Sequence, residues 1–170
     1  MRFQGRCFRA HHPAWAFEPT SGEGARLTGG RFNRKGTPAL YLALRLETAV
    51  GECAQGFAHR IPPMTLCEYE IDVEPVADLA SDEGRRALGI RLEELDCAWL
   101  ELMLEGRKVP SQEAAERLKR QGYAGALVPS FMPGAGPDDV NLVLWAWGNR
   151  RPWLVRVHDP EGRLGRSGSK

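Results

Sequence analysis

The chain has 170 residues, a length that one domain can fill around a core large enough to need no disulfide or structural metal. Its 23 basic and 22 acidic residues leave a formal charge of +1, which excludes direct nucleic-acid binding through a chain-wide basic surface. The sequence contains no apolar run of membrane-spanning length and no N-terminal signal segment, so we expect a cytoplasmic protein that does not bind membranes.

The first predicted element is a strand over residues 2–9, with Gly5 interrupting it. Arg9, at its end, either faces solvent or points into a site. A loop rich in Gly, Pro and Ser then reaches Gly30. It begins with His11 and His12, but no acidic or cysteine ligand stands at metal-binding spacing from them. The four cysteines form no CxxC pair and are expected to be small buried hydrophobes, so no metal is predicted.

The most informative stretch begins with a basic turn between glycines, GGRFNRKG at residues 29–36. Arg31 and Asn33 are its candidates for binding an anion such as a phosphate, because guanidinium and backbone N–H groups both suit that charge. Arg34 and Lys35 either serve a second phosphate or are simply solvated. The alternative for Arg31 is a surface salt bridge. Neither GxGxxG nor GxxxxGK[ST] occurs, which disfavours a Rossmann or P-loop site.

A buried strand over residues 38–43 and a helix over residues 47–59 are predicted next. Tyr41 in the strand is either a core aromatic or the wall of a ring-binding pocket. The helix has an apolar stripe that includes Cys53 and Phe57, and Glu52 borders this stripe. Glu52 is therefore either a solvated glutamate or a carboxylate facing a cleft.

The second half of the chain alternates strands and helices irregularly. Residues 64–73 predict a half-exposed strand, residues 92–104 a helical apolar stripe from Leu92 to Met103, and residues 110–121 a helix ended by Gly122. A buried strand over residues 125–129 delivers Ser130 at its end, before a Pro/Gly loop. Strands over residues 140–147 and 153–157 follow. The sum is an α+β domain with a curved, mixed or antiparallel sheet flanked by helices.

These motifs together resemble one known family. GGRFNRKGTPALYLA followed by Glu52, then PSQEAAERLKRQGYAGALVPS and NLVLWAW, resembles the RES domain, which is named for an arginine, a glutamate and a serine. The corresponding residues are Arg31, Glu52 and Ser130. The resemblance covers nearly the whole chain and implies a single domain over residues 1–160 with a flexible tail over residues 161–170. Phe32 departs from the family, which often has Trp or Tyr there.

The resemblance implies an ADP-ribosyltransferase-like fold and the toxin of a type II toxin–antitoxin pair. Such a toxin consumes NAD by hydrolysis or phosphorolysis and forms an oligomeric complex with an Xre-like helix-turn-helix antitoxin. By the same resemblance Glu52 is the catalytic carboxylate, Arg31 holds a phosphate or ribose of NAD, and Tyr41 lines the nicotinamide side. Ser130 bonds to the nicotinamide ribose or amide, and Asn141 is a weaker candidate. The alternatives are ADP-ribose transfer to a host protein and a non-catalytic module that binds NAD or ADP-ribose.

Overall fold

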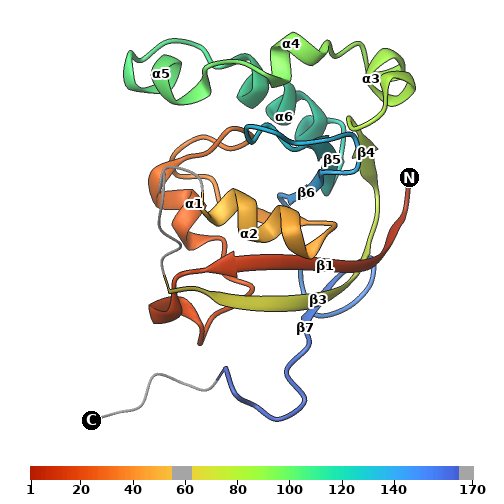
Figure 1. The fold of residues 1–170 in the computed structure, drawn as a ribbon. Coiled ribbons are helices and arrows are strands. Elements are labelled where there is room, and N and C mark those ends of the chain that lie inside the picture. The colour runs from red at the N-terminus through yellow and green to blue at the C-terminus, as the bar shows by residue number, and fades with distance from the viewer. Residues whose placement is uncertain (55–62, 165–170) are drawn as a thin grey trace.

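The computed structural model describes residues 1–54 and 63–164 of the chain, and within them seven strands form one mixed sheet (Figure 1). The spatial order is β4-β5-β6-β2-β1-β3-β7, with every neighbouring pair antiparallel except β4 and β5. The strands are β1 (Phe3–His11), β2 (Leu40–Ala43), β3 (Thr65–Val73), β4 (Val76–Asp78), β5 (Gly125–Pro129), β6 (Val140–Leu144) and β7 (Trp153–Val157).

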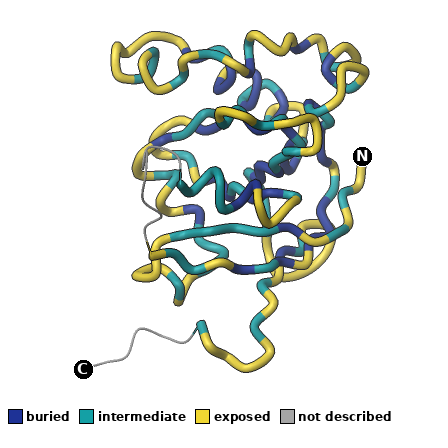
Figure 2. The backbone as a smooth tube through the Cα atoms, in the orientation of Figure 1, coloured by how far each residue is buried: buried dark blue, intermediate teal, exposed yellow. Residues whose placement is uncertain are grey.

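The helices flank this sheet, which confirms the expected α+β class with a mixed sheet. They are the 3-10 turn η1 (Pro13–Trp15), α1 (Glu23–Thr28), α2 (Leu46–Ala54), α3 (Asp82–Leu88), α4 (Leu92–Leu95), α5 (Trp99–Leu104) and α6 (Pro110–Arg120). Buried residues gather in the sheet and in α6, whereas the outer segment from α3 to α5 is mostly exposed (Figure 2). No helix among the described residues is both long and apolar enough to cross a membrane.

Two of the predicted elements form for the reasons read from the sequence. In β3 the alternate residues Cys67, Tyr69 and Ile71 are buried, as the period of two requires. Helix α6 begins with Pro110 and ends in a basic last turn, both of which suit helix termini. Gly122 follows at φ 86°, a left-handed conformation that favours glycine.

The prediction of one continuous apolar helical stripe over residues 92–104 is wrong, because these residues do not form a single buried face. The structure breaks it into α4 and α5, and Leu92 is 42% exposed although Leu95 is fully buried. The backbone carbonyls of Leu95 and Cys97 accept hydrogen bonds from the Arg31 side chain. Carbonyls at the end of a helix have no partner within the helix, and Arg31 bonds these two where the chain passes from α4 to α5.

Several other boundaries differ from the prediction or lie outside the described residues. The first strand reaches His11 rather than residue 9, and β6 ends at Leu144. Helix α2 is described to Ala54, so Phe57 and the predicted end of that helix lie outside the described residues. Most of the predicted tail over residues 161–170 also lies outside the described residues. The division of the chain into one domain and a tail therefore stays a prediction.

Candidate active site

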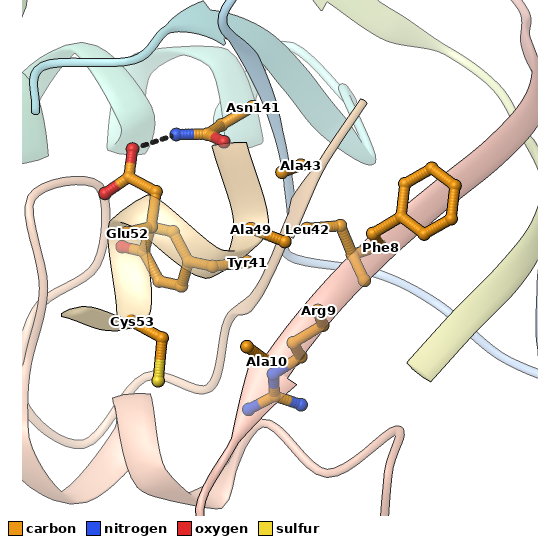
Figure 3. Close-up of a pocket in the computed structure, with 10 residues that line it drawn as sticks. All are labelled: Phe8, Arg9, Ala10, Tyr41, Leu42, Ala43, Ala49, Glu52, Cys53 and Asn141. Carbon is orange, nitrogen blue, oxygen red and sulfur yellow. Dashed lines mark hydrogen bonds between the residues drawn. The ribbon is translucent and has the colours of Figure 1, made fainter. Parts of the chain in front are cut away.

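A single carboxylate oxygen joins the two halves of the chain that the sequence singled out. Oε1 of Glu52, on α2, accepts hydrogen bonds of 2.6 Å from Ser130 Oγ and of 2.6 Å from Asn141 Nδ2. Figure 3 shows the Asn141 amide directed at this carboxylate. These two short bonds fix the orientation of the Glu52 side chain.

The sheet register explains why these three residues meet. Asn141 on β6 lies opposite Ala43, the last residue of β2, and the chain enters α2 three residues later. Asn141 also pairs with Val128 on β5, and Ser130 follows that strand at 8% exposure. Antiparallel pairing therefore brings the end of β5 and the start of β6 beside the helix that carries Glu52.

Two cavities meet at Glu52, of about 260 Å³ and about 450 Å³. Both are lined by Arg9, Tyr41, Glu52 and Asn141. The smaller has apolar walls and the larger is bounded by the glycine-flanked basic turn. The remaining lining residues of the smaller cavity are Phe8, Ala10, Leu42, Ala43, Ala49 and Cys53 (Figure 3). Among the described residues, Glu52 is the only acidic side chain that lines either cavity.

Arg31 lines the larger cavity and is held in place from behind. Its Nη1 donates to the carbonyl oxygens of Leu95 at 2.8 Å and Cys97 at 2.9 Å, and its guanidinium carbon lies 4.5 Å from the centroid of the Phe131 ring. Partial burial lowers the pKa of Arg31 by removing hydration from the cation, against the opposing pull of nearby acidic groups. The result is a fixed positive group at one end of the cleft.

The start of α6 holds the loop that carries Arg31. Ser111 Oγ donates to the backbone oxygen of Arg31 at 2.6 Å. Gln112 Nε2 donates to the backbone oxygens of Gly30 at 2.8 Å and Asn33 at 3.1 Å. Both side chains are buried, so water does not compete for these bonds. The basic turn is thus fixed by a helix about eighty residues later, which the local sequence did not indicate.

Asn33 lies behind the cavity wall, which differs from the ligand-binding role expected for it. The residue is 1% exposed, and its Nδ2 donates to the backbone oxygens of Ala25 at 2.8 Å and Thr37 at 2.9 Å. Its Oδ1 accepts a hydrogen bond of 2.8 Å from the hydroxyl of Tyr41. Burial raises the pKa of Tyr41, so the phenol stays protonated as a donor. Asn33 therefore positions Tyr41, whose ring lines both cavities.

Two further basic residues from the first half of the chain, Arg34 and Arg9, have different surroundings. Arg34 is exposed and pairs with Glu113 on α6, as a surface salt bridge. Arg9 lines both cavities, and its Nη1 donates to the backbone oxygens of Pro19 at 3.0 Å and Ser21 at 3.1 Å. The sequence left Arg9 undecided because strand alternation alone does not say which face is covered.

Chemically, the site offers one oriented carboxylate in a cleft that is also lined by two arginines, an aromatic ring and an apolar wall. A fixed carboxylate in a partly dry cleft stabilises positive charge that develops on a bound sugar. Arginine guanidinium groups suit phosphate oxygens. In the part of the chain that the structure describes, no group of three His, Cys, Asp or Glu side chains is arranged to hold a metal ion.

The family model described as the RES domain matches residues 6–167. The fold is similar to a chain of the M. tuberculosis MbcT–MbcA toxin–antitoxin complex, with a TM-score of 0.61 and 25% sequence identity. That likeness covers 94% of this chain and 84% of the other. No curated protein matches the chain significantly.

Proposed function

Because the chain belongs to the RES domain family, we propose that it is the toxin of a toxin–antitoxin pair and that it cleaves NAD between nicotinamide and ribose. The likeness to a toxin–antitoxin complex supports the first part of this proposal. The resemblance of the Arg31, Glu52 and Ser130 motifs to NAD-consuming members of the family supports the second.

One observation carries the enzymatic proposal: Glu52 is fixed by Ser130 and Asn141 at the point where the two cavities meet. A substrate that fills both cavities has its central part beside this carboxylate. NAD has such a shape, with a flat pyridinium ring, a ribose and a pyrophosphate. The apolar smaller cavity suits the ring, and the larger cavity with Arg31 suits the phosphates.

The proposed reaction breaks the bond between ribose C1′ and the pyridinium nitrogen. The bonding electron pair leaves with the nitrogen, so nicotinamide departs neutral and positive charge develops on the ribose. Glu52 stabilises this charge electrostatically. Water then bonds to C1′ through its oxygen and releases a proton to solvent, or an unprotonated oxygen of inorganic phosphate bonds there instead. The products are nicotinamide and either ADP-ribose or ADP-ribose phosphorylated on that carbon.

The test is nicotinamide release from NAD by the purified chain, freed of any antitoxin, with and without inorganic phosphate. We expect release by the wild type and its loss in Glu52→Gln, which keeps the shape and removes the charge. Glu47→Gln is the matched control, because Glu47 is an exposed carboxylate on the same helix. If the wild type leaves NAD intact under both conditions, the chain is not an NAD-cleaving enzyme.

Transfer of ADP-ribose to a host protein is the second candidate, since the same carboxylate serves any acceptor at C1′. Labelled NAD would then mark a discrete protein band rather than release free ADP-ribose. A non-catalytic binding module would bind NAD without consuming it, and overexpression would be harmless.

An Xre-like antitoxin is the proposed partner. It is tested by comparing growth during expression of the chain with and without the adjacent gene. We expect growth arrest without that gene and recovery with it. Equal growth in both cultures would contradict the toxin assignment.

A further inference from the structure

Three residues on one face of α2 contact the segment that joins β5 to β6. Thr48, Gly51 and Glu52 are spaced i, i+3 and i+4, which places them on the same side of the helix. Thr48 Oγ1 donates to Asp139 Oδ1 at 2.5 Å, and Glu52 accepts from Ser130. The two bonds lie at the two ends of the connecting segment.

Gly51, on the same face of α2, also contacts this segment. A Cβ at that position would lie 2.6 Å from the sulfur of Met132, so the Met132 side chain packs against the bare backbone of Gly51. The helix and the segment are thus in contact along a full turn.

Asp139 also closes the segment on itself. Its backbone oxygen accepts from Ser130 N at 2.7 Å, and its Oδ2 accepts from Gly136 N at 2.8 Å. Thr48 is 0% exposed, so the hydroxyl that bonds Asp139 is shielded from water. This bond also lowers the pKa of Asp139, which keeps the carboxylate ionised as an acceptor. A single aspartate therefore holds Ser130 through its backbone and α2 through its side chain.

We propose that Thr48 and Asp139 are positioning residues, which together set the location of Glu52 relative to Ser130 and Asn141. Neither belongs to the residues that line the two cavities described above. They act through the helix turn that separates Thr48 from Glu52. The kinetic test of this inference rests on the proposed NAD cleavage. The structural test, which compares atomic positions, does not depend on that function.

The expected kinetic effect follows from where each group lies. Arg31 and Tyr41 line the larger cavity from other parts of the chain and are not attached to this contact, so we expect substrate binding to be preserved. A shift of Glu52 by a fraction of an ångström weakens stabilisation of the transition state. We therefore expect Thr48→Val to lower kcat about tenfold or more while KM for NAD stays within about twofold.

The variants separate positioning from folding. Thr48→Val keeps the side-chain shape and removes the hydroxyl, whereas Thr48→Ser keeps the hydroxyl and restores activity. Asp139→Ala removes the acceptor from the other side. The double variant Thr48→Val/Asp139→Ala is expected to be no slower than the slower single variant, because both remove one interaction. Thr65→Val, on β3, controls for the substitution itself, and thermal melting of each variant monitors folding.

The outcomes distinguish this inference from the proposed function. If the wild type cleaves NAD and both Thr48→Val and Asp139→Ala keep full kcat, the positioning role is wrong and the function stands. If the wild type leaves NAD intact, the function fails and a crystal structure of Thr48→Val decides the inference. Separation of Glu52 Oε1 and Ser130 Oγ beyond hydrogen-bonding distance supports it, and an unchanged bond overturns it. Asp139→Ala replaces Thr48→Val in the same comparison if the valine variant does not fold.

Discussion

Ser130 Oγ donates to Oε1 of Glu52 at 2.6 Å, although the two residues are 78 positions apart in the sequence. Asn141 donates to the same oxygen. Glu52, on α2, is thus oriented by one group that follows β5 and one on β6.

Removing either donor is expected to slow NAD cleavage. Ser130→Ala and Asn141→Ala each leave Glu52 with one bond fewer, so its orientation is less well fixed. We expect kcat to fall about tenfold in each variant, measured as nicotinamide release. Asn149→Ala, at an exposed position after β6, is the control and should match the wild type. Full activity in both site variants would refute an orienting role for these residues.

Replacing Arg31 by lysine tests the fixed guanidinium. An ammonium group does not reproduce the planar cation that bonds the Leu95 and Cys97 carbonyls and faces the Phe131 ring. We expect Arg31→Lys to raise KM for NAD and to lower the free energy of unfolding by about 1–2 kcal/mol. Arg34→Lys is the matched control, since Arg34 is an exposed partner of Glu113. Equal KM values for the two variants would contradict the assigned role of Arg31.

Gly30 is expected to tolerate no side chain. A Cβ there would lie 2.7 Å from both Asn33 Oδ1 and the Tyr41 hydroxyl, which bond each other. Gly30→Ala should therefore destabilise the chain by about 1–3 kcal/mol in denaturant unfolding. Gly24→Ala, whose Cβ would meet no atom within 4 Å, is the control and should change stability by less than about 1 kcal/mol. A Gly30→Ala variant as stable as the control would show that the loop rearranges freely.

Asp72 makes stability depend on pH. Arg2 donates two bonds of 2.6 Å to this carboxylate, and Arg151 lies 3.3 Å from it. The Arg2 bonds hold the pKa of Asp72 below its ordinary value of 3.8. A lowered folded-state pKa contributes stability above the ordinary pKa, and this contribution is lost as the pH falls through the folded-state pKa.

The melting temperature should therefore be higher in the wild type than in Asp72→Asn at neutral pH. Below about pH 4 the difference should shrink as Asp72 becomes protonated. Thermal melting across that range measures it. A difference that stays constant down to strongly acidic pH would assign the effect to shape rather than to the ionised carboxylate.

Much of the fold could be predicted because its signals are local. The alternation in β3 and the proline start and basic end of α6 reflect geometry repeated within a few residues. The stripe over residues 92–104 could not be resolved in this way. At its break, two backbone carbonyls bond Arg31, a residue more than sixty positions earlier, and local periodicity carries no signal of that contact.

By itself, the sequence determined the α+β class, the family, and the order of Arg31, Tyr41, Glu52 and Ser130 along the chain, because residue type and spacing are properties of the chain. Only the tertiary structure decided that Ser130 and Asn141 bond the same oxygen of Glu52, and that Asn33 supports Tyr41 from behind. It also decided that Arg9 lines the cleft. Those relationships depend on strand register and on burial, which arise only when distant segments pack together.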